Sequence, residues 1–263
     1  MSDDRGALLK QVQQYWDTHP LGTQFLAPGA AGTPAALDLH RLERVMARWD
    51  YKPPLIDAVA ARIPGGTLLE IGCGLGTDLV QFARLGVAVT GVDVAPSVAA
   101  LAQRHLRTHA LPGEVVVGDA SALGFRDCSF DAVYSSGVLQ HVPDIEGAIA
   151  EIRRVLRDGG LAVCIVYHRY SWFNLLRRLG GVNVEFEDAD PPIIRTYSRR
   201  GLRRLFSAFS TATVRAEYHR PTPTPRTGAL ARGYNRVFVP GMRALPDALV
   251  RPFGWHLVIS AVR

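Results

Sequence analysis

The sequence predicts an α/β fold built on a parallel sheet, and three features of residues 66–168 support this prediction. Short apolar runs alternate with amphipathic stretches, which is the pattern of repeated strand–helix–strand units. Runs such as Leu161–Val166 are apolar at consecutive positions, as expected for strands that helices cover on both faces. A glycine-rich turn follows the first run directly, as in open α/β folds that bind ligands at the carboxyl edge of the sheet.

Five strands are predicted in this segment: Thr67–Cys73, Ala88–Val94, Glu114–Gly118, Phe130–Ser135 and Leu161–His168. Two of the connecting helices are also clear. One covers Ser97–His109 and begins after Pro96, a residue that suits the first turn of a helix. Another has apolar residues at helical spacing from Ile145 to Leu156, and we expect Gly159–Gly160 to end it.

The segments outside this core have a different pattern. Residues 1–63 are predicted to be helical, and Tyr15–Trp16 either forms a lid over the ligand or anchors the first helix. Residues 171–179 and 198–209 have the spacing of amphipathic helices flanked by arginines. Two further strands are predicted at Thr213–His219 and Trp255–Val262. The 35 residues between them are too many for a hairpin turn, which is typical of a functional or mobile connection.

The chain of 263 residues has a net charge of +6, and this charge is divided unevenly. Residues 1–150 contain 11 Lys and Arg against 16 Asp and Glu, whereas residues 151–263 contain 19 against 8. A hydrophobic content of 48% with 21% charged residues excludes a disordered chain. No apolar run is long enough to span a bilayer, and from the polar N-terminus we expect no secretory signal. The three cysteines without CxxC spacing favour a reducing compartment, so we expect a cytoplasmic protein.

The most specific feature is the segment EIGCGLGTD, which begins at Glu70. Glycines allow positive φ and a close approach of the backbone to a ligand. Thr77 occupies the position where a dinucleotide motif has its third glycine, and Glu70 would repel a pyrophosphate, so both residues disfavour NAD or FAD. Asp93 ends the second strand, where a carboxylate can accept hydrogen bonds from both ribose hydroxyls. Asp119 follows the third strand at the same edge.

At these motifs the chain resembles the class I S-adenosylmethionine-dependent methyltransferases. EIGCGLGTD, GVD, GDA, FDAVYSSGVLQHVPD and LRDGGLAVCIVYH are similar to the successive motifs of that family, and the similarity covers about residues 50–168. The similarity is closest to the small-molecule branch that contains the ubiquinone and menaquinone biosynthesis enzymes. The resemblance implies a Rossmann-like domain with a seven-stranded, mostly parallel sheet, an antiparallel last strand and S-adenosyl-L-methionine as cofactor.

The resemblance also implies the site residues. Glu70, Gly72 and Gly74 would surround the methionine and ribose, Asp93 would bind the ribose diol, and Asp119 and Ala120 would meet the adenine. Ser135 and Ser136 would lie beside the sulfonium. Cys73 and Val94, next to these residues in their loops, complete the predicted cofactor site. We therefore expect one domain over residues 1–263, with a helical lid (1–63), a cofactor-binding core (64–168) and a substrate cap with the final strands (169–263).

Three residues are candidates for the catalytic chemistry. His141 follows the fourth strand, where the resemblance implies a histidine near the methyl group; it acts either as a general base or only by packing and hydrogen bonding. Tyr167 and His168 end the fifth strand, so at least one of them is expected to point into the same crevice. Arg199 and Arg200 belong to the basic cap, which is expected to cover the substrate side and to favour an acidic or phenolate acceptor.

The predicted acceptor is a small, largely apolar or phenolic metabolite, methylated on O or C. RNA or protein methylation is one alternative, because residues 151–263 are basic, and a non-catalytic cofactor-binding protein is another. Ser135-Ser136-Gly137-Val138 does not match the N/D-P-P-Y/F motif of amino-methylating nucleic-acid enzymes, so no nucleic-acid partner is predicted. The acidic residues from Glu185 to Asp190 have no His or Cys beside them, so no metal is predicted. Peripheral membrane contact and the oligomeric state stay open.

Overall fold

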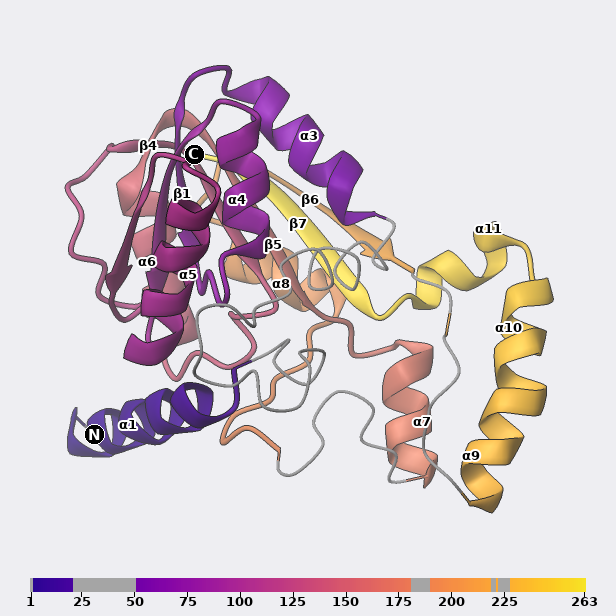
Figure 1. The fold of residues 1–263 in the computed structure, drawn as a ribbon. Helices are drawn as coiled ribbons and strands as arrows, with labels where there is room; N and C mark the ends of the chain where they lie inside the picture. The colour runs from indigo at the N-terminus through magenta and orange to yellow at the C-terminus, as the bar shows by residue number, and fades with distance from the viewer. Residues whose placement is uncertain (1, 21–50, 181–189, 219–220, 222–227) are drawn as a thin grey trace.

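Seven strands form one sheet in the computed structural model shown in Figure 1, which describes residues 2–20, 51–180, 190–218, 221 and 228–263. The strand order is β3-β2-β1-β4-β5-β7-β6, and β7 is antiparallel to both of its neighbours. The other neighbouring strands pair in parallel. The predicted α/β class and the seven-stranded, mostly parallel sheet are confirmed. The strands are β1 (Thr67–Ile71), β2 (Ala88–Asp93), β3 (Glu114–Val117), β4 (Phe130–Ser136), β5 (Leu156–Tyr167), β6 (Thr211–Glu217) and β7 (His256–Val262).

Helices cover both faces of this sheet. One face packs against α3 (Lys52–Arg62), α4 (Thr77–Arg84) and α5 (Pro96–Thr108), with Ile56, Phe82 and Leu106 in the core. The other packs against α6 (Ile145–Val155) and α8 (Arg199–Leu205), with Ile152 and Leu202 in the core. This arrangement explains the consecutive apolar residues of β5, because a strand between two helical layers buries both of its sides.

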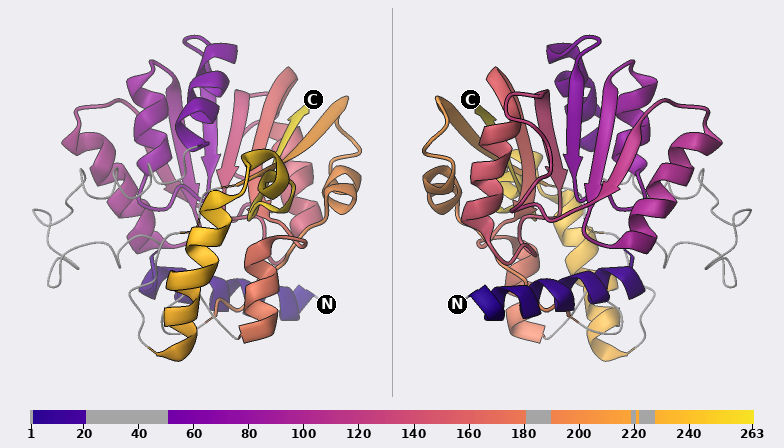
Figure 2. Two further views of the ribbon diagram at one scale, coloured as in Figure 1. Left: turned by 90° about the vertical axis from the view of Figure 1, so that its right-hand side faces the viewer. Right: turned by 90° about the vertical axis from the view of Figure 1, so that its left-hand side faces the viewer.

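Helix α1 (Ser2–Thr18) lies beyond the carboxyl edge of the sheet and packs on neither of its faces (Figures 1 and 2). Gln13 Nε2 donates to the carbonyl oxygen of Val94 at 3.0 Å, just after β2. The carboxylate of Asp17 accepts from the backbone N–H of Ser97 at 2.9 Å, at the start of α5. Because both contacts are made with segments that follow β2, α1 is held across the ends of the strands.

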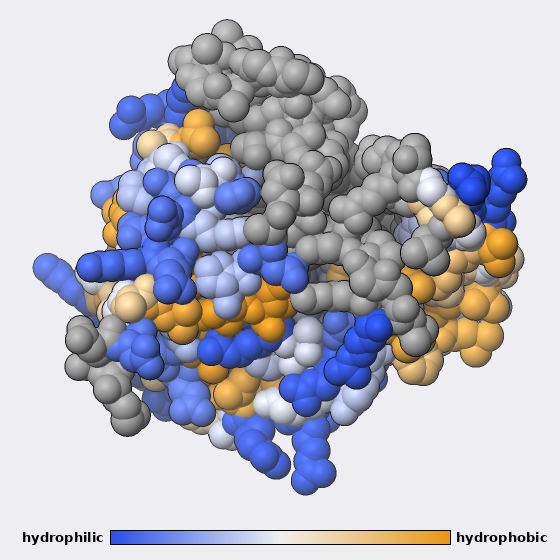
Figure 3. Space-filling model, turned by 90° about the horizontal axis from the view of Figure 1, so that it is seen from below, coloured by the Kyte–Doolittle hydropathy of each residue, from blue (hydrophilic) through white to orange (hydrophobic). Residues whose placement is uncertain are grey.

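The C-terminal part adds helices on the same side of the molecule. Figure 2 shows α7 (Trp172–Gly180) and α10 (Val239–Ala244) extending beyond the sheet edge that α1 crosses. The long connection between β6 and β7 contains structure that its spacing did not predict: α9 (Ala229–Gly233), a π-helical turn (Tyr234–Phe238), α10, α11 (Asp247–Val250) and a 3₁₀ turn (Arg251–Phe253). Figure 3, viewed from this side, shows hydrophobic surface on the right, where α10 lies in Figure 1; the exposed apolar residues of the connection include Val237 and Leu249.

The predicted end of one helix is wrong. Helix α6 stops at Val155, and the next residue, Leu156, already has extended φ and ψ angles of −69° and 143°. Leu156 is fully buried and pairs with Phe130 of β4, so tertiary packing ends the helix before the glycines are reached. Gly159 and Gly160 instead lie inside β5, where the N–H of Gly159 and the carbonyl of Gly160 bond to Arg263.

Candidate active site

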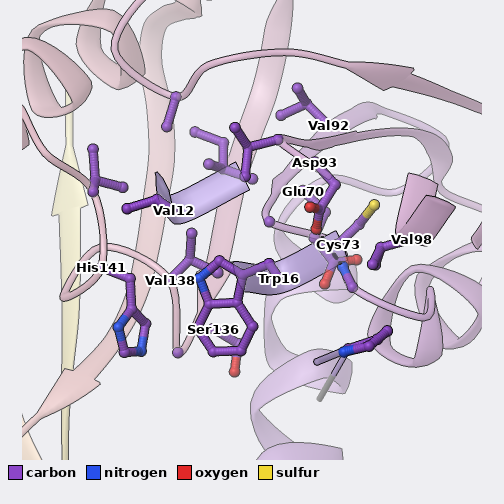
Figure 4. Close-up of a pocket in the computed structure, with 18 of the residues that line it drawn as sticks. Val12, Trp16, Glu70, Cys73, Val92, Asp93, Val98, Ser136, Val138 and His141 are labelled. Atoms are coloured by element: carbon purple, nitrogen blue, oxygen red, sulfur yellow. Dashed lines mark hydrogen bonds between the residues drawn. The ribbon is translucent and has the colours of Figure 1, made fainter. Parts of the chain in front are cut away.

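A cavity opens at the carboxyl ends of β1, β2 and β4, beneath α1. Its lining combines the glycine turn after β1, the ends of β2 and β3, the loop after β4 and apolar residues of α1. Figure 4 shows Trp16 of α1 between His141 on one side and Glu70, Cys73 and Asp93 on the other. The lining residues predicted from the sequence are Glu70, Gly72, Cys73, Gly74, Asp93, Val94, Asp119, Ala120, Ser136, His141 and Tyr167.

The turn after β1 requires glycine because of its backbone conformation and its close packing. Gly72 and Gly74 have φ of +66° and +53°, in the left-handed region that favours glycine. A Cβ at Gly72 would overlap the side chain of Val138, which shows how closely the turn approaches the loop after β4. The N–H of Gly72 donates to the carbonyl of Val92 at 2.7 Å. This hydrogen bond therefore holds the turn against β2, and the first residues of α4, which follow the turn, line the cavity.

Two carboxylates lie at the ends of β2 and β3, as predicted. Asp93 is buried and accepts hydrogen bonds from the N–H groups of Gly74 and Ala95, each at 3.0 Å. Burial raises its pKa, and these backbone donors oppose that rise. Asp119 accepts from the N–H and the hydroxyl of Ser121 at 2.9 and 2.8 Å, so its carboxylate is partly committed to its own loop. The Asp93 bond to Gly74 joins the glycine turn to the end of β2.

His141 and Tyr167 line the cavity together. The Nδ1 atom of His141 lies 2.6 Å from the carbonyl oxygen of Ile193, which fixes Nδ1 as the protonated nitrogen and leaves the lone pair on Nε2. Burial lowers the pKa of His141 to about 4, and Arg195 adds to that effect. The ring contacts those of Trp16 and Tyr167, with centroids 5.0 and 5.9 Å apart. The imidazole is thus neutral, oriented and enclosed by aromatic rings.

Four predicted residues lie elsewhere. His168 does not line the cavity; it is buried, with Nδ1 3.0 Å from the carbonyl oxygen of Gly254, because alternation along the chain turns it away from the side of Tyr167. For the same reason Ser136 lines the cavity and the fully buried Ser135 does not. Arg199 and Arg200 belong to α8, on the far face of the sheet, and neither lines the cavity.

Three ionisable lining residues were not predicted. Lys52 and Asp78 form a buried ion pair at 2.6 Å, and His256 is almost fully buried with Nδ1 2.9 Å from the hydroxyl of Tyr51. His256 reaches the cavity because it pairs with Tyr167 in the antiparallel register of β5 and β7. Asp78 is the last residue of the segment EIGCGLGTD, so the sequence could have indicated it. Lys52 and His256 reach the cavity only through contacts between distant segments.

The residues that the structure describes contain no group of three or more His, Cys, Asp or Glu side chains arranged to hold a metal ion. The acidic stretch at 185–188 lies outside the described residues. Among the described helices, none combines the length and the apolar character needed to cross a membrane.

Comparison with known proteins matches this geometry to a family. Residues 69–164 match the family model of the methyltransferase domain. The chain contains a class I S-adenosylmethionine-dependent methyltransferase domain. The match begins within β1, includes the glycine turn and ends within β5, and it confirms the prediction that the cofactor of this methyltransferase domain is S-adenosyl-L-methionine.

Curated relatives match less than half of the chain. An uncharacterised 37.1 kDa protein in transposon TN4556 of Streptomyces fradiae is 42% identical over 129 residues, which are 48% of this chain and 36% of that protein. A ubiquinone biosynthesis O-methyltransferase of Xanthomonas campestris is 36% identical over 111 residues, which are 41% of this chain and 46% of that enzyme. The chain thus spans less than half the length of these relatives.

A solved structure shares the fold over almost the whole chain. It is the methyltransferase in a complex with the Trm112 methyltransferase activator of Haloferax volcanii, with a TM-score of 0.63 and 19% identity. The alignment covers 95% of this chain and 96% of that one. The methyltransferase fold therefore includes the C-terminal strands beyond residue 164.

Proposed function

We propose that the protein transfers a methyl group from S-adenosyl-L-methionine to a small, largely apolar or phenolic metabolite, on O or C. The observation that carries this proposal is that His141 and Tyr167 line the same cavity as the glycine turn and Asp93. Apolar and aromatic residues, among them Val12, Trp16 and Val142, make up much of the remaining lining. The name of the Xanthomonas relative, a ubiquinone biosynthesis O-methyltransferase, supports methylation of oxygen on a small molecule.

The cofactor roles follow from the same lining. Glu70, Gly72, Cys73 and Gly74 would surround the methionine and ribose, Asp93 and Val94 the ribose, Asp119 and Ala120 the adenine, and Ser136 the sulfur. A carboxylate with two backbone donors already in place, as at Asp93, is held rigidly enough to orient ribose hydroxyls. The buried carboxylates of Glu70 and Asp78 each include an oxygen that accepts no hydrogen bond from the described part of the chain, which fits a ligand that carries N–H groups. In this assignment α1 is the lid, and the segments after residue 168 form the cap.

In methyl transfer, the main contribution of the protein is to orient the two reactants. When bound, the cofactor supplies a methyl group whose bond to sulfur breaks as the bond to the acceptor forms, and the electron pair stays on sulfur. Holding the methyl donor and the acceptor close together and in line accounts for much of the rate of such a displacement. His141, with its lone pair on Nε2, would accept a hydrogen bond from the acceptor hydroxyl and aim its oxygen at the methyl group. Because its pKa is about 4, His141 would orient the acceptor hydroxyl but would not keep the proton that the hydroxyl loses. That proton passes to solvent.

Binding and turnover test this proposal separately. Isothermal titration with S-adenosylhomocysteine measures the cofactor site, and methyl-labelled cofactor with a panel of phenols and quinols, against RNA and protein, measures transfer. We expect Asp93→Asn to weaken binding at least about tenfold and the exposed control Asp57→Asn to leave it unchanged. Absence of binding at millimolar ligand would refute the cofactor site, whereas label only in RNA or protein would refute the small acceptor.

A further inference from the structure

The segment Ala229–Phe253, which runs from α9 through α10 and α11 to the 3₁₀ turn, exposes large apolar side chains. Half of the large apolar side chains that are exposed in the described part of the chain lie in this one segment. They are Val237, Leu245, Leu249 and Phe253, with exposed fractions of 73%, 44%, 62% and 56%. Single exposed apolar residues are ordinary, but a group of them on one segment indicates an interaction surface. We call the exposed side of this segment the cap surface.

The opposite side of the same helices is packed into the protein. Phe238 and Met242 pack against a cluster of buried aromatic side chains. That cluster consists of Tyr167, Trp172, Phe173 and Trp255. Val237, Pro240 and Ala244 are exposed and follow one another at intervals of three and four residues, so they form one stripe on the outer side. The stripe is therefore exposed because these helices bury their other side.

Arginines border this apolar stripe. The segment contains four arginines, all of them exposed, and one acidic residue, Asp247. Arg232, Arg236 and Arg243 recur at intervals of four and seven residues, which places them on one side of the helix, next to the stripe. Arg251 follows in the 3₁₀ turn. Apolar side chains with arginines beside them are typical of a helix that lies in a membrane interface, where the cations contact lipid phosphates.

Two other occupants fit this surface less well. A nucleic acid would pair with the arginines but would leave Val237 and Leu249 without an apolar partner. A second copy of the chain would bring arginines against arginines, because a symmetric dimer pairs one patch with itself. The charge and the apolar groups together fit a surface that is both negatively charged and apolar beneath its charges.

We infer that the cap surface binds one face of an anionic membrane. Val237, Leu249 and Phe253 enter the boundary between the lipid head groups and the acyl chains, and Arg232 and Arg236 contact the lipid phosphates. The attraction has an apolar part, which salt leaves intact, and an electrostatic part, which salt screens.

The cap surface is connected to the cavity through the aromatic cluster. Tyr167 belongs to that cluster and lines the cavity, and the ring centroids of Trp172 and Phe238 are 5.5 Å apart. Figure 2 shows α10 extending beyond the sheet edge at which the cavity opens. Membrane binding would therefore bring the cavity close to a phase in which an apolar acceptor concentrates. This consequence rests on the proposed function, whereas membrane binding itself does not.

Sedimentation of the full chain with vesicles tests the inference. We expect binding to vesicles of phosphatidylcholine mixed with an equal amount of phosphatidylglycerol, much weaker binding to phosphatidylcholine alone, and weaker binding as salt is added. Arg232→Gln/Arg236→Gln should lower the affinity more than about tenfold, because each arginine at an anionic lipid surface contributes about fivefold. The matched control is Arg203→Gln/Arg204→Gln in α8, which removes the same charge from the far face of the sheet.

A second pair of variants tests the apolar stripe. Val237→Ser/Leu249→Ser should weaken binding to the anionic vesicles by more than about tenfold, because two side chains that would enter the lipid become polar. Leu85→Ser/Val117→Ser is the matched control: these residues are 47% and 53% exposed and lie beside β2 and in β3, at the other end of the strand order from β6 and β7. An unchanged midpoint of urea unfolding shows that each variant is folded.

The outcomes separate the candidate occupants. Absence of binding to the anionic vesicles at low salt would overturn the inference, and so would a loss in the control variants as large as in the cap variants. Binding that depends on the arginines but not on Val237 and Leu249 would also overturn it, because any polyanion, RNA included, would then do. Dimerisation that Val237→Ser/Leu249→Ser abolishes, without vesicle binding, would assign the surface to a second copy instead. If the chain binds vesicles but methylates no acceptor, the proposed function fails and membrane binding stands.

Discussion

The two halves of the cavity are built in different ways. The half under β1, β2 and β3 is local: Asp93 bonds to Gly74, 19 positions away, and Asp119 bonds to Ser121 beside it. The half under β4, β5 and β7 joins distant segments, since His141 bonds to Ile193 and His256 to Tyr51, 205 positions away. A motif read along the chain can therefore specify the first half, whereas the second exists only after the chain has folded.

Two glycines test this division with the largest expected effect: Gly72 in the first half, and Gly254, which lies just before the β7 strand of the second half. Gly72→Ala places a Cβ against Val138 at positive φ, which costs about 1–2 kcal/mol for the left-handed backbone and about 1–3 kcal/mol more for overpacking. Because the turn must shift, affinity for S-adenosylhomocysteine should fall by more than about tenfold. In Gly254→Ala the added Cβ overlaps the backbone of Glu217 at the end of β6, so this substitution should destabilise the protein by about 1–3 kcal/mol with little change in that affinity.

Urea unfolding and isothermal titration measure both quantities. Gly241→Ala is the matched control: this exposed glycine of α10 has no atom within 4 Å of an added Cβ, so alanine should stabilise by about 0.5–1 kcal/mol. If Gly254→Ala weakened cofactor binding as strongly as Gly72→Ala, the two halves would be coupled and the division would be wrong.

The same division sets what could be predicted from the sequence. The strands, the glycine turn and the carboxylates at 93 and 119 follow from patterns within a few residues, and the structure places the turn and both carboxylates in the cavity lining. His168 and Ser135 were misplaced because strand ends alone do not give the side on which each residue points. His256 and Lys52 were missed because their positions depend on the register of β7 and on the packing of α3. Gly159–Gly160 suggested a helix end, but the burial of Leu156 ended it earlier.

His141 gives a prediction of intermediate size that sharpens the account of the second half. Its pKa of about 4 lies below the value of about 6.5 for an exposed histidine, so the unfolded chain binds more protons between these pH values. Stability from this group is therefore complete above pH 6.5 and is lost as the pH falls toward 4, by up to about 3 kcal/mol. His141→Asn keeps a donor for the Ile193 carbonyl and should remove this part of the slope.

Thermal or urea unfolding of both proteins across pH 4–8 measures the difference. In turnover, the neutral form of His141 is already present above about pH 5, so the rate should show no ionisation near 6.5 in that range. An acid limb near pH 6.5 that disappears in His141→Asn would mean that the imidazole is exposed during turnover. The enclosure of His141 by Trp16 and Tyr167 would then not hold in the working enzyme.

The smallest effect is expected at α1, the proposed lid, which contacts both halves. Arg5 lies 2.8 Å from the Asp144 carboxylate and 2.8 Å from the Ser121 hydroxyl, and 3.7 Å from the Asp119 carboxylate. Its side chain is 45% exposed, so these contacts contribute roughly 0–1 kcal/mol and weaken in salt. Arg5→Ala should therefore speed the release of S-adenosylhomocysteine about two- to fivefold at low salt and less at high salt, in stopped-flow measurements. The exposed Arg203 of α8, on the far face of the sheet, is the matched control. An equal effect of Arg203→Ala would show that net charge, and not the lid, governs release.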